Sequence, residues 1–315
     1  MSLKLLDELS LPGDHAKPNE DSFACLDRAA LVLDGATPLG PPLLPGPSDA
    51  AWIAQFGARR LSTYLKDGDP PDDALKHALE DTEKSFAGLA RAPIREKWQM
   101  PCASMMLIYD PIRTSQAREP ATALGSLGRE ACPASSADAR GGRGSQSRSI
   151  QFFWYGDCAA LIEQDGKVEI VGEAIKKRKA EAARAERTAR EKNLASALGA
   201  NRPEIEPLLR ATRNRINSGG NWLFSPDPRA AKHVSRQTLA IQEGARMLLA
   251  SDGFLALVSD YDAYDVPGLI RAAAGKGLTR LGEELRAIEM DDAQGGRFFR
   301  FKPSDDATAL FLQLI

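Results

Sequence analysis

The fold of this chain follows from residues 20–35, which read EDSFACLDRAALVLDG. Two short apolar stretches lie on either side of the polar pair Asp27-Arg28, a pattern that is typical of two paired strands. An acidic residue stands at each edge of the pair, Asp21 before the first stretch and Asp34 after the second. We therefore predict a pair of strands with a carboxylate at each edge.

The next segments predict two helices in succession. Ser48 can cap a helix whose apolar residues, from Trp52 to Leu65, recur near a helical period. A second helix begins at the Pro-Pro-Asp-Asp sequence of residues 70–73. Two consecutive helices after two strands do not fit the alternation of a parallel α/β sheet, so a doubly wound fold is disfavoured.

The rest of the chain predicts more strands and one more amphipathic helix. Asp165-Gly166 is a common two-residue hairpin turn, so the segments that flank it predict an antiparallel ladder. The predicted strands are 103–109, 150–155, 158–163, 167–171, 246–250 and 308–315, and the helix runs through Leu278, Leu281, Leu285 and Ile288.

Two segments have too little apolar content to join a core. Residues 113–149 are rich in Ser, Ala, Gly and Arg without periodicity, so we expect a long flexible insertion at the surface. Residues 173–198 are Ala-rich and strongly charged, and charge pairs at i,i+4 spacing predict a solvated helix. Residues 176–179 of this helix carry four adjacent positive charges, which are either simply solvated or steer acidic substrates.

Composition excludes several classes of protein. The 315 residues are 43% hydrophobic and 27% charged, as in an ordinary globular protein. The net charge is −2, so no overall attraction draws the chain to nucleic acid or to an anionic membrane. The four cysteines form no C-x-x-C pair, which predicts reduced, buried thiols. Neither a signal peptide nor an apolar stretch of membrane-spanning length is visible, and we expect a cytoplasmic protein.

Carboxylates recur at the ends of apolar strands, often beside glycine. Hard divalent cations such as Mg²⁺ and Mn²⁺ prefer oxygen ligands, and strand ends of a packed sheet can meet at one rim. Asp165-Gly166 is the exception, because its hairpin context explains it as a turn. The segments with this placement are Glu20-Asp21, Asp34-Gly35, Gly156-Asp157, Asp252-Gly253 and Asp305-Asp306.

These segments, in this order, resemble the motifs of the metal-dependent type 2C protein serine/threonine phosphatases, the PPM family. NEDSF at 19–23 resembles the opening acidic motif of the family, and LVLDG at 31–35 resembles its strand that ends in Asp-Gly. YGDCA at 155–159 is similar to its Gly-Asp segment. LLASDGF at 248–254 and DDATA at 305–309 resemble its two closing motifs. The resemblance extends over nearly the whole chain.

The resemblance implies a site with two divalent cations, Mn²⁺ or Mg²⁺. Asp34 would bridge the two cations, and Gly35 would contribute its carbonyl oxygen. Asp252 and Asp305 would complete the ligands of the second cation. Asp34 and Asp252 are therefore the residues that we expect to be essential for catalysis.

The resemblance also implies outer ligands and a fold. Glu20 and Asp21 would hold water molecules that bind the cations, and Asp157 would assist a third, weaker ion. The fold would be of the α+β class, a four-layer sandwich of two antiparallel β-sheets flanked by helices. Residues 1–315 would form a single catalytic domain with the insertions at 113–149 and 173–198.

Two departures from the family pattern concern phosphate and proton transfer. Many members carry an Arg four residues before the acidic residue, but here that position is Ala16. Its neighbours His15 and Lys17 are the nearest cations and become the candidates for binding phosphate. Some members have a His after Asp-Gly, but here Ala36 takes its place, so water would have to protonate the leaving group.

The implied activity is hydrolysis of phosphoserine and phosphothreonine in a phosphoprotein substrate by a metal-activated water. The chain has three His and no Ser-His-Asp or Cys-His spacing, which agrees with water as the nucleophile. Two alternatives stay open. One is a phosphatase for a small phosphorylated metabolite or nucleotide, and the other is a catalytically weak regulatory domain that binds phosphoproteins.

Overall fold

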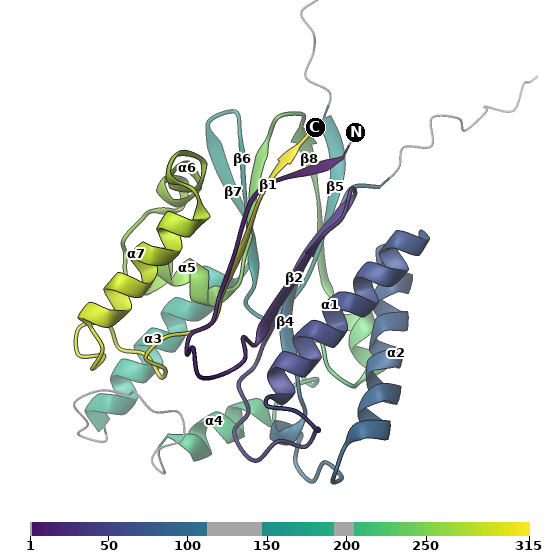
Figure 1. Cartoon of the computed structure of the whole chain (residues 1–315), viewed down its shortest axis with the longest axis vertical. Helices are drawn as coiled ribbons and strands as arrows, with labels where there is room; N and C mark the ends of the chain where they lie inside the picture. The colour runs from purple at the N-terminus through teal and green to yellow at the C-terminus, as the bar shows by residue number, and fades with distance from the viewer. Residues whose placement is uncertain (1, 112–146, 192–204) are drawn as a thin grey trace, which may run out of the picture.

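Two antiparallel five-stranded sheets pack face to face in the computed structural model, which describes residues 2–111, 147–191 and 205–315 (Figure 1). The first sheet has the order β1 (Leu3–Leu11), β10 (Ala307–Leu314), β9 (Arg246–Ala250), β6 (Ala159–Gln164) and β7 (Lys167–Gly172). The second has the order β2 (Asp21–Cys25), β3 (Ala29–Gly35), β4 (Ala103–Tyr109), β5 (Ser147–Tyr155) and β8 (Ser235–Gln242).

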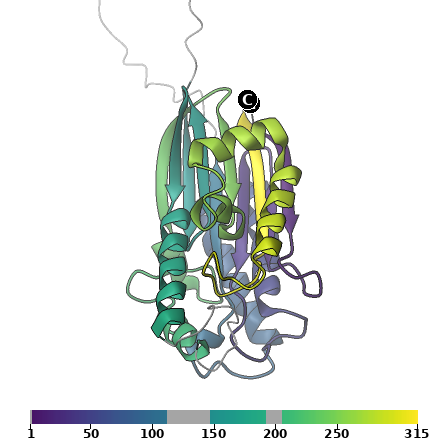
Figure 2. The same ribbon diagram turned by 90° about the vertical axis from the view of Figure 1, so that its left-hand side faces the viewer.

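Helices cover the outer faces of both sheets, so the chain forms four layers, as predicted (Figures 1 and 2). α1 (Asp49–Asp67) and α2 (Pro71–Leu89) cover the second sheet. α5 (Asp252–Ser259), α6 (Val266–Lys276) and α7 (Leu278–Asp291) cover the first. The other helices are α3 (Ala174–Glu191), α4 (Glu206–Arg213) and the 3₁₀ turns Lys97–Gln99 and Pro228–His233.

The apolar run in β3 is continuous because both faces of the strand are buried. Ala30 and Val32 lie in the core between the two sheets. Leu31 and Leu33 point the other way, into the core under α1 and α2. Successive side chains of a strand alternate between its faces, so an inner strand with helices on one side and a second sheet on the other needs apolar residues at every position.

Local features predicted from the sequence are present. β2 and β3 pair antiparallel, with Asp21 opposite Asp34. Ser48 caps α1, where its Oγ accepts the backbone N–H of Ala51 at 3.2 Å. Asp165 and Gly166 form the turn between β6 and β7 with positive φ angles of 52° and 72°.

Other features differ from the predictions. The edge strand β1 was not predicted, because the charged residues within LKLLDELSL interrupt its apolar pattern. Most of the predicted insertion at 113–149 lies outside the described residues, but residues 147–149 belong to β5, where they pair with β8. The predicted helix at 173–198 is described as α3 up to residue 191, and the remainder lies outside the described residues.

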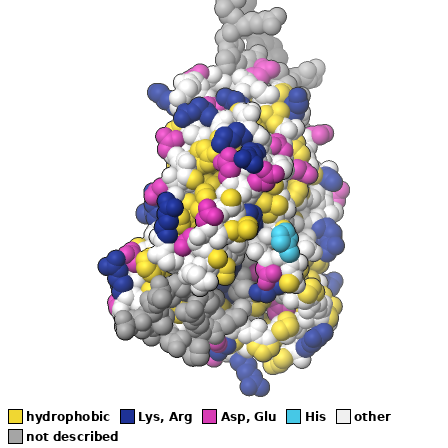
Figure 3. All heavy atoms as spheres, turned by 60° about the vertical axis from the view of Figure 1, so that its left-hand side comes forward, with side chains coloured by type: hydrophobic (Ala, Val, Ile, Leu, Met, Phe, Trp, Pro, Cys, Tyr) yellow, Lys and Arg dark blue, Asp and Glu magenta, His cyan; other side chains and the backbone are white. Residues whose placement is uncertain are grey.

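The distribution of surface charge and the character of the helices agree with the composition. On the face shown in Figure 3, cationic and anionic side chains are intermingled, in keeping with the net charge of −2. Within the described ranges, none of the helices combines the length and the apolar character that crossing a bilayer requires.

Candidate active site

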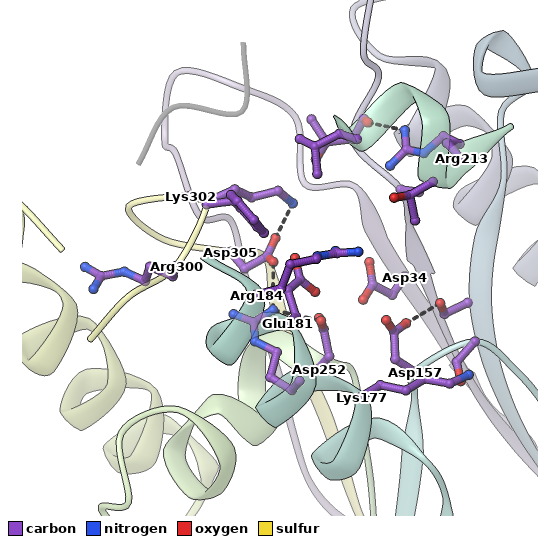
Figure 4. Close-up of a pocket in the computed structure, with 18 of the residues that line it drawn as sticks. Asp34, Asp157, Lys177, Glu181, Arg184, Arg213, Asp252, Arg300, Lys302 and Asp305 are labelled. Carbon is purple, nitrogen blue, oxygen red and sulfur yellow. Dashed lines mark hydrogen bonds and ion pairs between the residues drawn. The ribbon is translucent and has the colours of Figure 1, made fainter. Parts of the chain in front are cut away.

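Four aspartates from distant parts of the chain point into one cavity of about 310 Å³ (Figure 4). Asp34 lies near the end of β3, and Asp157 lies in the turn between β5 and β6. Asp252 is the first residue of α5, and Asp305 precedes β10. Antiparallel pairing within each sheet and the packing of the two sheets bring these positions to one end of the sandwich.

The tightest group is formed by Asp34, Asp157 and Asp252, whose carboxylate oxygens lie within 4.8 Å of one another. Loss of hydration raises the pKa of Asp34 well above its usual value, and the charges of Asp21 and Asp252 add to the effect. Loss of hydration, followed by the charge of Asp252, also raises the pKa of Asp157, although Ser104 donates a hydrogen bond to its carboxylate. Among the described residues, only Asp252 of the three forms an ion pair, with Arg178, so Asp34 and Asp157 have no cationic partner there.

Two glycines allow backbone segments to approach this group. A Cβ on Gly35 would lie 2.4 Å from the carbonyl oxygen of Ala50, and a Cβ on Gly253 would lie 2.0 Å from that of Asp306. Both glycines follow the aspartates that the sequence analysis selected, Asp34 and Asp252. The Asp-Gly pairs are therefore required by close packing rather than by a returning turn.

Glu20 and Asp21 lie behind the cavity rather than on its lining. The Glu20 carboxylate accepts hydrogen bonds of 2.5 Å from Thr37 Oγ1 and Ser48 Oγ. Asp21 is 5% exposed, and its Oδ2 accepts a 2.8 Å hydrogen bond from Ser251 Oγ. Its Oδ1 is buried and has no hydrogen-bond partner among the described residues.

Asp306 connects two backbone segments behind the cavity. Its two carboxylate oxygens accept the backbone N–H groups of Gly13 at 2.6 Å and of Glu20 at 2.7 Å. Asp306 thus joins the β1–β2 connection to the start of β10 and acts as a structural group.

The donor set fits a hard divalent cation. All the donors in the Asp34, Asp157 and Asp252 group are carboxylate oxygens, which Mg²⁺ and Mn²⁺ prefer. The unpaired buried oxygen of Asp21 is a second sign of missing positive charge or ordered water, because buried polar atoms are rarely left without a partner. The predicted ligands Asp34, Asp157 and Asp252 are brought together, and both Asp252 and Asp305 also form ion pairs with cationic side chains.

Arg178 is a site residue that the sequence analysis missed. Its Nη1 lies 2.7 Å from Asp252 Oδ2 and 3.2 Å from Asp305 Oδ2, and its Nε lies 2.8 Å from Asp260 Oδ2. These carboxylates outweigh the opposing effect of burial and raise the pKa of Arg178 well above its usual value. The pattern of α3 showed only a run of positive charges, and no signal in the sequence marked Arg178 as the one that turns inward.

Asp305 has a second cationic partner. Lys302 Nζ lies 2.6 Å from Asp305 Oδ1. Burial works against ionisation of Asp305, but Lys302 and Arg178 outweigh it and lower the pKa of Asp305. The spacing of three residues between Lys302 and Asp305 could have indicated this pair.

The two predicted phosphate-binding residues lie elsewhere. His15 and Lys17 are exposed in the connection between β1 and β2, and neither is among the described residues that line the cavity. Lys17 Nζ lies 3.5 Å from Asp14 Oδ2 at the surface. The cationic side chains that line the cavity are Lys177, Arg178, Arg184, Arg213, Arg300 and Lys302.

Arg184 differs from the other cations of the lining. Lys177, Arg213 and Arg300 donate to backbone carbonyl groups at 2.8, 2.5 and 3.0 Å, respectively. The Nε of Arg184 is buried and has no hydrogen-bond partner within the described ranges. Arg184 therefore lines the cavity with at least one donor nitrogen that the described residues leave unused.

Comparisons with known proteins identify the fold. No family model matches the chain, and no curated protein matches it. The structure resembles the Mycobacterium tuberculosis serine/threonine phosphatase PstP/Ppp, with a TM-score of 0.51 at 15% sequence identity, over 100% of this chain and 99% of that chain. It also resembles Stp1, a serine/threonine phosphatase from Staphylococcus aureus, with a TM-score of 0.51 at 13% identity over 99% of this chain and 95% of the other.

A third similar structure contains metal. It is the catalytic domain of PstP in complex with two manganese ions, with a TM-score of 0.50 at 13% identity, over 99% of this chain and 98% of that chain. Together these matches show that the chain has the fold of the type 2C phosphatases over its whole length, as the sequence motifs predicted.

Proposed function

We propose that this protein is a metal-dependent phosphatase that hydrolyses phosphoserine and phosphothreonine in proteins. The observation that carries the proposal is the convergence of Asp34, Asp157 and Asp252 within 4.8 Å of one another in a cavity on a type 2C phosphatase fold. Asp34, with Gly35 beside it, is the proposed central ligand. The structures of similar fold include a phosphatase with two manganese ions, which supports a divalent cation as the cofactor.

The acidic residues in and behind the cavity have separate proposed roles. Asp34 and Asp157 would hold the first cation, and Asp252 with Asp305 would complete the place for the second. Divalent cations held in this way neutralise phosphoryl charge and activate water as a nucleophile. Glu20 and Asp21 keep the surrounding backbone and water in place from behind the cavity.

Arg184 is the proposed phosphate ligand in place of the Arg that the family pattern has before the acidic motif. It lines the cavity and its Nε has no hydrogen-bond partner within the described ranges, whereas His15 and Lys17 are exposed outside the cavity. A planar guanidinium can bind two phosphate oxygens at once.

Parallel assays test this function. We expect hydrolysis of a phosphothreonine peptide in the presence of Mn²⁺, and loss of hydrolysis with a chelator or in Asp34→Asn. Asp165→Asn, which changes an exposed turn carboxylate, is the matched control and should keep full activity. Turnover of Asp34→Asn at the wild-type rate in saturating Mn²⁺ would contradict the proposal.

The same assays decide between substrates and between phosphate ligands. Preferred hydrolysis of a nucleotide over the peptide would favour the small-substrate alternative, and the absence of turnover would favour a binding domain. We expect Arg184→Gln to raise KM for p-nitrophenyl phosphate about tenfold or more, as for the loss of a charged hydrogen bond. Lys17→Gln should leave KM unchanged. If Lys17→Gln raises KM and Arg184→Gln does not, Lys17 rather than Arg184 is the phosphate ligand.

A further inference from the structure

Arg178 is the member of the basic run on α3 that forms ion pairs with the carboxylates of the cavity. Its side chain is 11% exposed, whereas Lys176 and Lys179 are exposed. The earlier expectation that residues 176–179 act together as a solvated charge run is therefore wrong for Arg178. Lys177, beside it, donates at 2.8 Å to the carbonyl oxygen of Gly156.

The Arg178 guanidinium binds two carboxylates that the second cation would need. Its Nη1 bridges Asp252 Oδ2 at 2.7 Å and Asp305 Oδ2 at 3.2 Å. Asp305 also receives Lys302 Nζ at 2.6 Å through its other oxygen. The negative charge available to a cation between Asp252 and Asp305 is thus already neutralised by side chains of the protein.

We propose that Arg178 is an intramolecular competitor of the second divalent cation, which binds between Asp252 and Asp305 only when Arg178 leaves them. This inference rests on the proposed function, because it assumes that the carboxylate group binds metal. A guanidinium and a divalent cation that share the same carboxylate oxygens repel each other strongly at the short distances involved. The first cation, between Asp34 and Asp157, does not require this movement.

The apolar packing of α3 opposes such a movement only weakly. The fully buried side chains of α3 are small, namely Ala174, Ala185, Thr188 and Ala189, and the larger Ile175 is only partly buried against the core. Small side chains remove little apolar surface from water, so they hold a helix weakly. The three ion pairs of Arg178 are therefore a major attachment of α3 to α5 and to the segment before β10. A cation that takes Asp252 and Asp305 removes two of these three ion pairs and leaves the pair with Asp260.

Direct measurement of Mn²⁺ binding tests the proposal without reference to activity. Isothermal titration of the wild-type protein should show one tighter and one weaker site. In Arg178→Gln, the weaker site should tighten about tenfold or more, in the usual range of coupling between sites. The tighter site should stay within about threefold. Lys179→Gln removes an equal charge from the exposed side of the same helix and should behave like the wild type.

A second variant acts without touching the predicted metal ligands. Asp260 accepts the Arg178 Nε at 2.8 Å, and its side chain is 4% exposed. Asp260→Asn keeps the size of the side chain but removes the negative charge that pairs with Arg178. The affinity of the weaker Mn²⁺ site should therefore rise, as in Arg178→Gln. This variant also decides the question should Arg178→Gln fail to fold.

Hydrogen exchange reports the movement itself. Mn²⁺ beyond the first equivalent should speed exchange of the α3 amides in the wild type, and α3 of Arg178→Gln should exchange fast even without metal. The proposed competition is wrong if the weaker site has the same Mn²⁺ affinity in the wild type, Arg178→Gln and Asp260→Asn while Asp34→Asn abolishes the tighter site. If the wild type binds no Mn²⁺ and Asp34→Asn changes nothing, the proposed metal site itself is wrong.

Discussion

Replacing Asp21 with Asn tests whether crowded carboxylates destabilise the metal-free protein. Burial, with the charges of Asp306 and Asp305 added, raises the pKa of Asp21 from 3.8 to about 8, although a hydrogen bond from Ser251 opposes the change. The folded state therefore keeps a proton that the unfolded state has already lost between these pH values. The stability that comes from this proton is present at acidic pH and is lost as the pH rises through about 8.

The size of the effect follows from the shift. One pKa unit corresponds to about 1.4 kcal/mol, so roughly four units correspond to about 5–6 kcal/mol if Asp21 acted alone. Asp305 and Asp306 share the repulsion and remain in the variant, so we expect about half of this value. Asp21→Asn should raise the free energy of unfolding by about 3 kcal/mol at pH 8.5, and by less than about 1 kcal/mol at pH 5.

Urea denaturation in the presence of a chelator measures both values. Asn keeps the size of the side chain and an oxygen that can accept the Ser251 hydroxyl. Asp165→Asn, in the exposed β6–β7 turn, is the control and should change stability by less than about 0.5 kcal/mol at either pH. The reasoning is refuted if Asp21→Asn changes stability equally at the two pH values, or lowers it at pH 8.5.

Three further predictions concern a tightly packed glycine, the attraction of acidic substrates and the binding of Mn²⁺. Gly253→Ala places a Cβ 2.0 Å from a carbonyl oxygen and should lower the free energy of unfolding by roughly 2–4 kcal/mol. Gly275→Ala, with open space around it on α6, should raise this free energy by up to about 1 kcal/mol, and urea titrations measure both variants. Lys176→Gln combined with Lys179→Gln should lower kcat/KM for a phosphopeptide about threefold at low salt but not at about 0.5 M salt, and should leave p-nitrophenyl phosphate hydrolysis unchanged. Mn²⁺ at about 100 times its Kd should stabilise the wild type by about 2.7 kcal/mol in thermal denaturation, and Asp34→Asn should remove this gain.

Several local elements can be read directly from the amino-acid sequence. The polar break between two apolar stretches produced the β2–β3 pair, and Asp165-Gly166 produced the hairpin turn. Ser48 marked the start of α1. These features depend on backbone preferences and hydrogen bonds within a few residues, so they can be read without knowing the rest of the fold. The order of the acidic motifs also identified the fold as a whole.

Which charged groups come into contact depends on the packing of the whole chain. Asp34 and Asp252 are far apart in the chain, and their distance depends on the packing of the two sheets. Likewise, four basic residues in a row point in different directions around α3, and the contacts with α5 select Arg178 to face inward. Arg184 follows on the same helix, with an Nε that has no partner within the described ranges, whereas His15 and Lys17, close to the acidic motif in sequence, lie outside the cavity lining. Proximity in sequence does not determine the direction of a side chain, because direction follows from the packing of the whole element against its neighbours.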